Sequence, residues 1–137
     1  MEYLIGLVLA AAVAGSASVI GLDRERAFYP TVLMVIASYY VLFAAMAASR
    51  KTLLLEIVIA SGFSAVAVVG FKKMFWLIPT ALIGHGLFDS VHRFVIHNPG
   101  VPQWWPGFCL AFDLFAGAWL AMHLPRYPDG CWRNDKA

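Results

Sequence analysis

Five apolar stretches take up most of this chain, and each is near the 20 or so residues needed to cross a bilayer core of about 30 Å. They cover residues 3–22, 30–49, 52–71, 75–96 and 106–124. Charged residues, proline and glycine separate them, and the connections are short. Consecutive helices joined by short connections pack as antiparallel neighbours. The pattern predicts an all-α integral membrane bundle of five transmembrane helices, forming a single domain over residues 1–137.

The composition supports a membrane protein and gives no indication of a nucleic-acid partner. Of the 137 residues, 61% are hydrophobic and 13% are charged, whereas an ordinary soluble domain carries roughly 25% charged residues. The net charge of +2 is too small to indicate binding to nucleic acid. The first stretch lacks the basic flank of a signal peptide, so we expect it to remain as a helix. The expected partner is the lipid bilayer.

The distribution of lysine and arginine predicts the orientation of the helices. The connections after the first and third stretches, together with the C-terminal segment, hold most of these residues. The opposite side holds Arg50, Lys51 and Arg93. By the positive-inside rule, this bias places the N-terminus outside and residues 125–137 as a cytoplasmic tail, in a multi-pass protein of a bacterial inner membrane. The residues on the predicted cytoplasmic side are Arg24, Arg26, Lys72, Lys73, Arg126, Arg133 and Lys136.

Ionisable side chains interrupt the fourth stretch, in the segment GHGLFDSVHRF. At about 100° per residue, His85, Asp89 and His92 point to the same side of a helix. Gly84 and Gly86 flank His85, so a neighbouring helix or a ligand could approach the backbone closely there. The segment therefore predicts a polar face directed into the bundle.

Two further carboxylates lie in other stretches at similar depth. Glu56 belongs to the third stretch and Asp113 to the fifth. With a rise of about 1.5 Å per residue, Glu56 and His92 lie roughly 6 Å from the outer ends of their helices. The same count puts Asp89 and Asp113 at roughly 10 Å and His85 near the midplane. Five ionisable groups from three helices are thus expected to share the outer leaflet.

A metal site is the interpretation that we favour for these groups. Each ionisable residue at the centre of a spanning helix costs about 2.5 to 3.5 kcal/mol on insertion scales, so the groups need partners. Imidazole and carboxylate ligands on facing helices suit a divalent Zn, Fe or Mn ion. The predicted function is a metal-dependent membrane hydrolase acting on a lipid or another apolar substrate. The predicted ligands are His85, Asp89, His92, Glu56 and Asp113, of which Glu56, Asp89 and Asp113 are also predicted catalytic groups.

We expect the first shell to take two ligands from the fourth helix and one each from Glu56 and Asp113. Two other classes of function stay open. The groups could form a structural ion-pair cluster in an accessory subunit of a larger complex. They could also belong to a proton- or metal-ion transporter, which would have to act as a homo-oligomer because five helices leave little room for a gated path.

The segment from His85 to Asp113, HGLFDSVHRF…NPGVPQWWPGFCLAFD, resembles small bacterial polytopic membrane proteins of unassigned function. The resemblance implies a membrane location and no particular activity. Within this segment Pro99, Pro102 and Pro106 stiffen the connection, which could cap a site or serve only as a connector. Cys109 is interpreted as a small packing residue.

Overall fold

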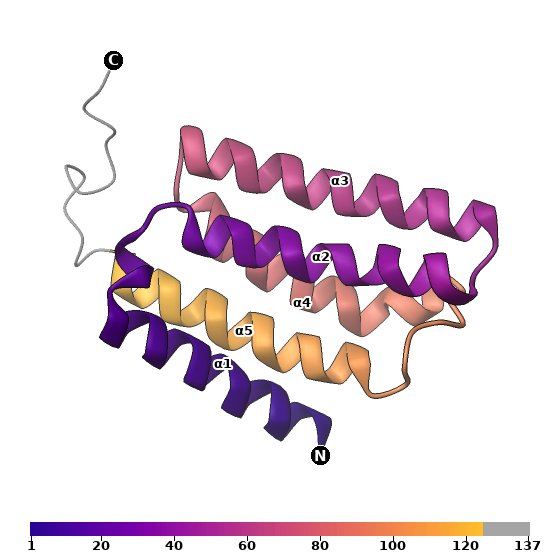
Figure 1. Cartoon of the computed structure of the whole chain (residues 1–137), viewed down its shortest axis with the longest axis horizontal. Coiled ribbons are helices and arrows are strands. Elements are labelled where there is room, and N and C mark those ends of the chain that lie inside the picture. Colours follow the sequence, from indigo (N-terminus) through magenta and orange to yellow (C-terminus); the bar gives the residue numbers. More distant parts are fainter. Residues whose placement is uncertain (125–137) are drawn as a thin grey trace.

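The computed structural model describes residues 1–124, which form five α-helices and no strand. The helices run side by side in alternating directions (Figure 1). This arrangement confirms the all-α bundle. The proposed cytoplasmic tail, 125–137, lies outside the described residues. The helices are α1 (Glu2–Ile20), α2 (Phe28–Ala47), α3 (Arg50–Lys72), α4 (Leu77–Val95) and α5 (Trp105–His123), with a short 3-10 turn η1 (Leu22–Arg24) after α1.

Four helices, α1, α2, α3 and α5, are long and apolar enough to cross a membrane. Their outward faces carry large apolar side chains, among them Val19 at 89% exposure and Val58 at 69%. Such surfaces suit lipid and are unusual on a soluble monomer. The α4 helix has 19 residues but lies outside this group of four, because histidine, aspartate and arginine lower its hydropathy.

Local chemistry sets the helix ends within a few residues of the predicted ones. The first helix stops at Ile20, two residues early, because Gly21 adopts a left-handed φ of 87° and its amide bonds to the carbonyl of Ala17. The third starts at Arg50, two residues early, because the Ser49 side chain accepts a hydrogen bond from the amide of Thr52.

The α4 helix packs against α5, α3 and α2, while α1 packs on α5. Small residues on α1 allow that contact to be close. A Cβ atom added at Gly6 would lie 2.3 Å from the carbonyl oxygen of Phe108, and Ala10, Ala14 and Ala17 continue the same buried face. The α4 helix thus turns the face with His85, Asp89 and His92 into the bundle, while its opposite face exposes apolar side chains such as Phe94 and Val95.

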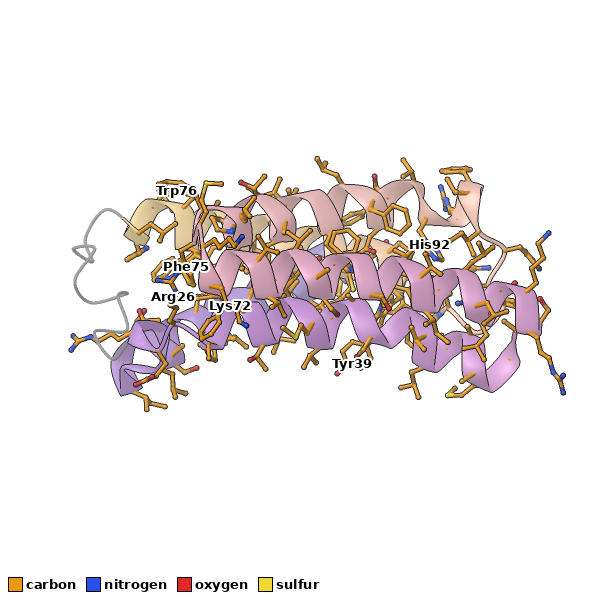
Figure 2. All side chains as sticks on the ribbon, turned by 90° about the horizontal axis from the view of Figure 1, so that it is seen from above. Arg26, Tyr39, Lys72, Phe75, Trp76 and His92 are labelled. Carbon is orange, nitrogen blue, oxygen red and sulfur yellow. The ribbon has the colours of Figure 1, made fainter. Side chains whose placement is uncertain are left out.

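The two ends of the bundle differ in character. We call the end that holds Met1 and the 96–104 loop the Met1 end, and the other the Arg26 end. Figure 2 shows Arg26, Lys72 and Phe75 together at one end and His92 toward the other. The core nearer the Arg26 end contains a layer of apolar side chains with at most 2% exposure. These side chains are Leu33, Ile78, Leu82 and Leu120.

Candidate functional site

Three ionisable side chains from α4 and α5 meet in the buried interior. The Nδ1 atom of His85 lies 2.7 Å from Oδ2 of Asp113 and 3.4 Å from Oδ2 of Asp89. One potential ligand atom from each of the three lies within 4.8 Å of the others. All three side chains are at most 2% exposed. We call His85, Asp89 and Asp113 the inner triad.

Close packing of α4 on α5 brings the inner triad together. A Cβ atom added at Gly86 would lie 2.9 Å from the Cβ of Asp113, and one added at Gly117 would lie 3.0 Å from the carbonyl oxygen of Pro79. Each helix therefore presents a glycine where the other approaches. Two antiparallel helices held this closely place His85 opposite Asp113, while Asp89 lies one turn further along α4 on the same face.

The carboxylates of the inner triad have few hydrogen-bond donors. Both oxygens of Asp89 and the Oδ1 atom of Asp113 are buried without a hydrogen bond of ordinary geometry. The hydroxyl of Tyr40 and the thiol of Cys109 lie close enough to Asp89 to interact with it. Buried polar atoms are nearly always satisfied in folded proteins. Two carboxylates that share one imidazole nitrogen therefore form an acceptor-rich centre that needs a cation or a proton.

Glu56 and His92 form a second polar group nearer the Met1 end. The Nε2 atom of His92 lies 2.9 Å from Oε1 of Glu56, and the side-chain amide of Asn98 donates a hydrogen bond of 2.9 Å to the same oxygen. The amide of Asn98 also donates to the carbonyl oxygen of Tyr40 at 3.2 Å. Glu56 and His92 are at most 2% exposed. We call Glu56, His92 and Asn98 the outer group.

Tyr40 lies between the outer group and the inner triad. Its ring centroid is 4.1 Å from that of His92 and 6.4 Å from that of His85. Its hydroxyl interacts with Asp89. Tyr40 therefore separates the two polar groups by one aromatic ring, and its hydroxyl forms no hydrogen bond of ordinary geometry.

A pocket of about 730 Å³ opens at the Met1 end, and the outer group contributes to its lining. His92 and Asn98 belong to this lining, and so do Arg93, His97 and Gln103. Trp104 and Pro102 of the 96–104 loop, with Pro106 at the start of α5, complete one wall. The loop therefore borders a cavity that reaches the polar interior, as a capping loop would.

The structure separates the five ionisable residues singled out in the sequence into two groups. His85, Asp89 and Asp113 lie together, whereas Glu56 and His92 pair with one another and with Asn98. Arg93 lies outside both groups, with its guanidinium carbon 4.7 Å from the ring centroid of Phe94. Sequence reasoning missed Asn98 and the bridging position of Tyr40. The Asn-Pro-Gly turn was the available signal for Asn98, because asparagine in such a turn often bonds to nearby backbone.

The inner triad is the group among the described residues that could hold a metal ion. Zinc bonds to nitrogen and oxygen of about 2.0 to 2.2 Å place two ligand atoms at most about 4.4 Å apart. The distance of 3.4 Å from His85 to Asp89 lies inside that limit, and the 2.7 Å contact between His85 and Asp113 is a hydrogen bond that an ion would replace. Imidazole and two carboxylates also form a common donor set for Zn, Fe or Mn.

No protein-family model, curated protein or solved structure matches this chain.

Proposed function

We propose that this chain is a divalent-metal-dependent membrane enzyme, a hydrolase, whose ion is held by His85, Asp89 and Asp113. In this proposal all five helices cross the membrane and the Met1 end faces outward. The substrate is a lipid or another apolar molecule that reaches the site from the bilayer. The outer group and the pocket at the Met1 end form the access side.

The acceptor-rich inner triad carries this proposal. Two buried aspartates supply two negative charges when ionised, and one imidazole supplies at most one positive charge. Three of the four carboxylate oxygens lack a hydrogen bond of ordinary geometry. A divalent cation would balance the charge and occupy these acceptors. A proton retained on one carboxyl group is the competing explanation, and it corresponds to the structural cluster of an accessory subunit.

A bound ion at this position would polarise a carbonyl or phosphoryl oxygen and activate water. The residues of the chain supply the rest of the machinery. The Glu56 carboxylate holds the His92 imidazole in one orientation between the pocket and Tyr40, which is the position required of a general acid or base. Tyr40 lies between this imidazole and Asp89 of the inner triad.

A layer of apolar side chains toward the Arg26 end favours a pocket over a conduction path. The side chains of Leu33, Ile78 and Leu82 are fully buried there. The series of polar groups therefore runs from the Met1 end into the core, and the apolar layer lies beyond it. A transporter would need a polar route past that layer. This observation is why we place the enzyme ahead of a proton- or metal-ion transporter.

Metal analysis of the purified protein tests the proposal. The protein is purified in detergent from metal-replete medium, and its Zn, Fe and Mn contents are measured by plasma mass spectrometry. We expect one ion per chain in the parent, and loss of that ion in Asp89→Asn and Asp113→Asn, which keep the shape of the side chain. His97→Ala, at an exposed histidine in the pocket wall, is the matched control and should retain the ion.

Turnover and flux measurements then separate the classes of function. The enzyme predicts metal-dependent release of product from a phospholipid–detergent suspension, which Asp113→Asn abolishes. A parent protein without stoichiometric metal would overturn the proposal. Proton or metal flux into proteoliposomes that depends on Asp89 would point to the transporter. Absence of both metal and flux, with Asp89→Asn affecting only assembly, would point to an accessory subunit.

A further inference from the structure

An apolar groove of about 570 Å³ runs between α1, α2 and α5. Its lining is mostly apolar, and aromatic side chains of α5 form much of its floor. Because α1, α2 and α5 are each long and apolar enough to cross a membrane, such a groove would be open to lipid chains and not to water. The α1 and α5 helices contribute Ile5, Leu9, Val13, Trp105, Phe108 and Phe112.

The groove lies on the opposite side of Cys109 from the inner triad. Cys109 lines it, is 2% exposed, and interacts with Asp89 on the other side. Phe112, the residue before Asp113, lines it as well. A molecule in the groove is therefore separated from the acidic centre by the Cys109 side chain and the neighbouring backbone of α5.

The groove also adjoins the polar pocket at the Met1 end. Trp104 lines both cavities. Among residues 1–124 the guanidinium of Arg93, on the pocket side, forms no ion pair within 4 Å, whereas Glu2 is paired with the terminal ammonium at 3.2 Å. The two cavities thus meet at Trp104, and the unpaired Arg93 lines the one at the Met1 end.

We infer that pocket and groove form one site for an anionic phospholipid, with its phosphate at Arg93 and an acyl chain along α1 and α5. The lengths agree. The groove covers eight residue steps on α1, from Ile5 to Val13, or about 12 Å at 1.5 Å per residue. One leaflet of the hydrocarbon core is about 15 Å thick. This inference rests on the proposed function, because it identifies the substrate class of the same site.

A second groove supplies an internal control. It lies between α2 and α3, has a volume of about 640 Å³, and is lined by residues such as Ser38, Ala60 and Ser64. It is comparable in size to the first groove and would face the same bilayer. Neither the inner triad nor the polar pocket shares a residue with it. Non-specific lipid contact would occupy both grooves equally, whereas a specific site would favour the first.

Photo-crosslinking tests the assignment. The protein is reconstituted in phosphatidylcholine vesicles that contain phosphatidic acid with a diazirine on one acyl chain, and crosslinked peptides are mapped. We expect crosslinks on α1 between Ile5 and Val13 and on α5 between Trp105 and Phe112. Leu9→Trp and Val13→Trp, which fill the groove, should each lower this labelling by about tenfold. Ala60→Trp in the second groove should leave it unchanged.

The headgroup contact is tested by Arg93→Gln, with Arg50→Gln at the same end as the control. Loss of one exposed ion pair should lower labelling by phosphatidic acid by up to about fivefold. It should lower labelling by a diazirine phosphatidylcholine less, because the choline cation offsets the charge of that phosphate. Equal labelling of the two grooves, or labelling insensitive to both tryptophan variants, would overturn the lipid site. Metal content is measured on the same samples, so that a lipid site without metal would contradict only the proposed function.

Discussion

Gly86 of α4 lies directly against Asp113 of α5, where an added Cβ atom would come within 2.9 Å of the Cβ of Asp113 and 3.3 Å of the carbonyl oxygen of Leu110. The contact is one step along the chain from His85, whose imidazole bonds to the same aspartate. The absence of a side chain at residue 86 therefore sets the distance between the two halves of the inner triad.

Gly86→Ala should disrupt the inner triad. The new methyl group meets a Cβ atom and backbone, which cannot move as a flexible side-chain tip can, so α4 and α5 must separate. We expect a loss of about 1 to 3 kcal/mol in the free energy of unfolding and reduced metal content. Thermal unfolding in detergent and metal analysis measure the two effects. Gly84→Ala, where an added Cβ meets nothing within 4 Å, should keep the stability and the metal content of the parent. Equal stability and metal content in the two variants would contradict the prediction.

Glu56→Gln should weaken the outer group without removing the ion. The amide keeps the shape of the carboxylate but loses its charge, so the contacts with His92 and Asn98 become weaker, at a cost of about 1 to 3 kcal/mol. Unfolding experiments measure the cost, and Glu25→Gln, at an exposed position beside η1, is the control. Loss of metal in Glu56→Gln would show that Glu56 is a ligand, as the five-residue set predicted from the sequence requires.

Asn98→Ala should loosen the 96–104 loop. The side chain of Asn98 donates to the carbonyl oxygen of Tyr40 and to Glu56, and its Oδ1 atom accepts a hydrogen bond from the amide of Gly100. Removing it leaves buried acceptors unsatisfied, at a cost of about 1 to 3 kcal/mol. We expect faster hydrogen exchange in the loop, read by mass spectrometry. Gln103→Ala at an exposed position should exchange like the parent, and a similar rate in Asn98→Ala would argue against the anchoring role.

Arg26→Lys should destabilise the Arg26 end and leave the metal content unchanged. The Nε atom of Arg26 donates to the carbonyl oxygen of Phe71, and the guanidinium carbon lies 5.3 Å from the ring centroid of Phe75. Figure 2 shows Arg26 and Phe75 together at this end. Lysine lacks the planar group that makes both contacts, so we expect a loss of about 1 to 2 kcal/mol in thermal unfolding. Arg24→Lys, at an exposed position, is the control, and equal stability of the two variants would refute the prediction.

Much of the fold could be predicted from the sequence because a helix that crosses a bilayer must satisfy its backbone internally and present an apolar surface. That requirement appears directly as five long apolar stretches. The helix ends were less predictable, because single residues set them. Gly21 stops α1 by adopting a left-handed conformation, and Ser49 starts α3 by capping it.

The candidate site was predictable in its components. The spacing of His85 and Asp89 places them on one face of any α-helix, and the count of residues from each helix end gives their depth. The sequence could not tell how five groups at similar depth would divide, because depth says nothing about rotation around the helix axis. Asn98 could not be predicted because it lies in a loop, where no helical periodicity indicates which way a side chain points.

The sequence by itself determined an all-α bundle of apolar helices with ionisable residues directed into it, since hydropathy and the 3.6-residue period are local properties of the chain. Only the tertiary structure decided that His85 meets Asp113 while His92 meets Glu56. The packing of α4 on α5 through Gly86 and Gly117, and the position of Asn98 over Glu56, depend on contacts between distant segments. Such contacts depend on how the side chains of distant segments fit together, and this fit cannot be predicted from any one segment alone.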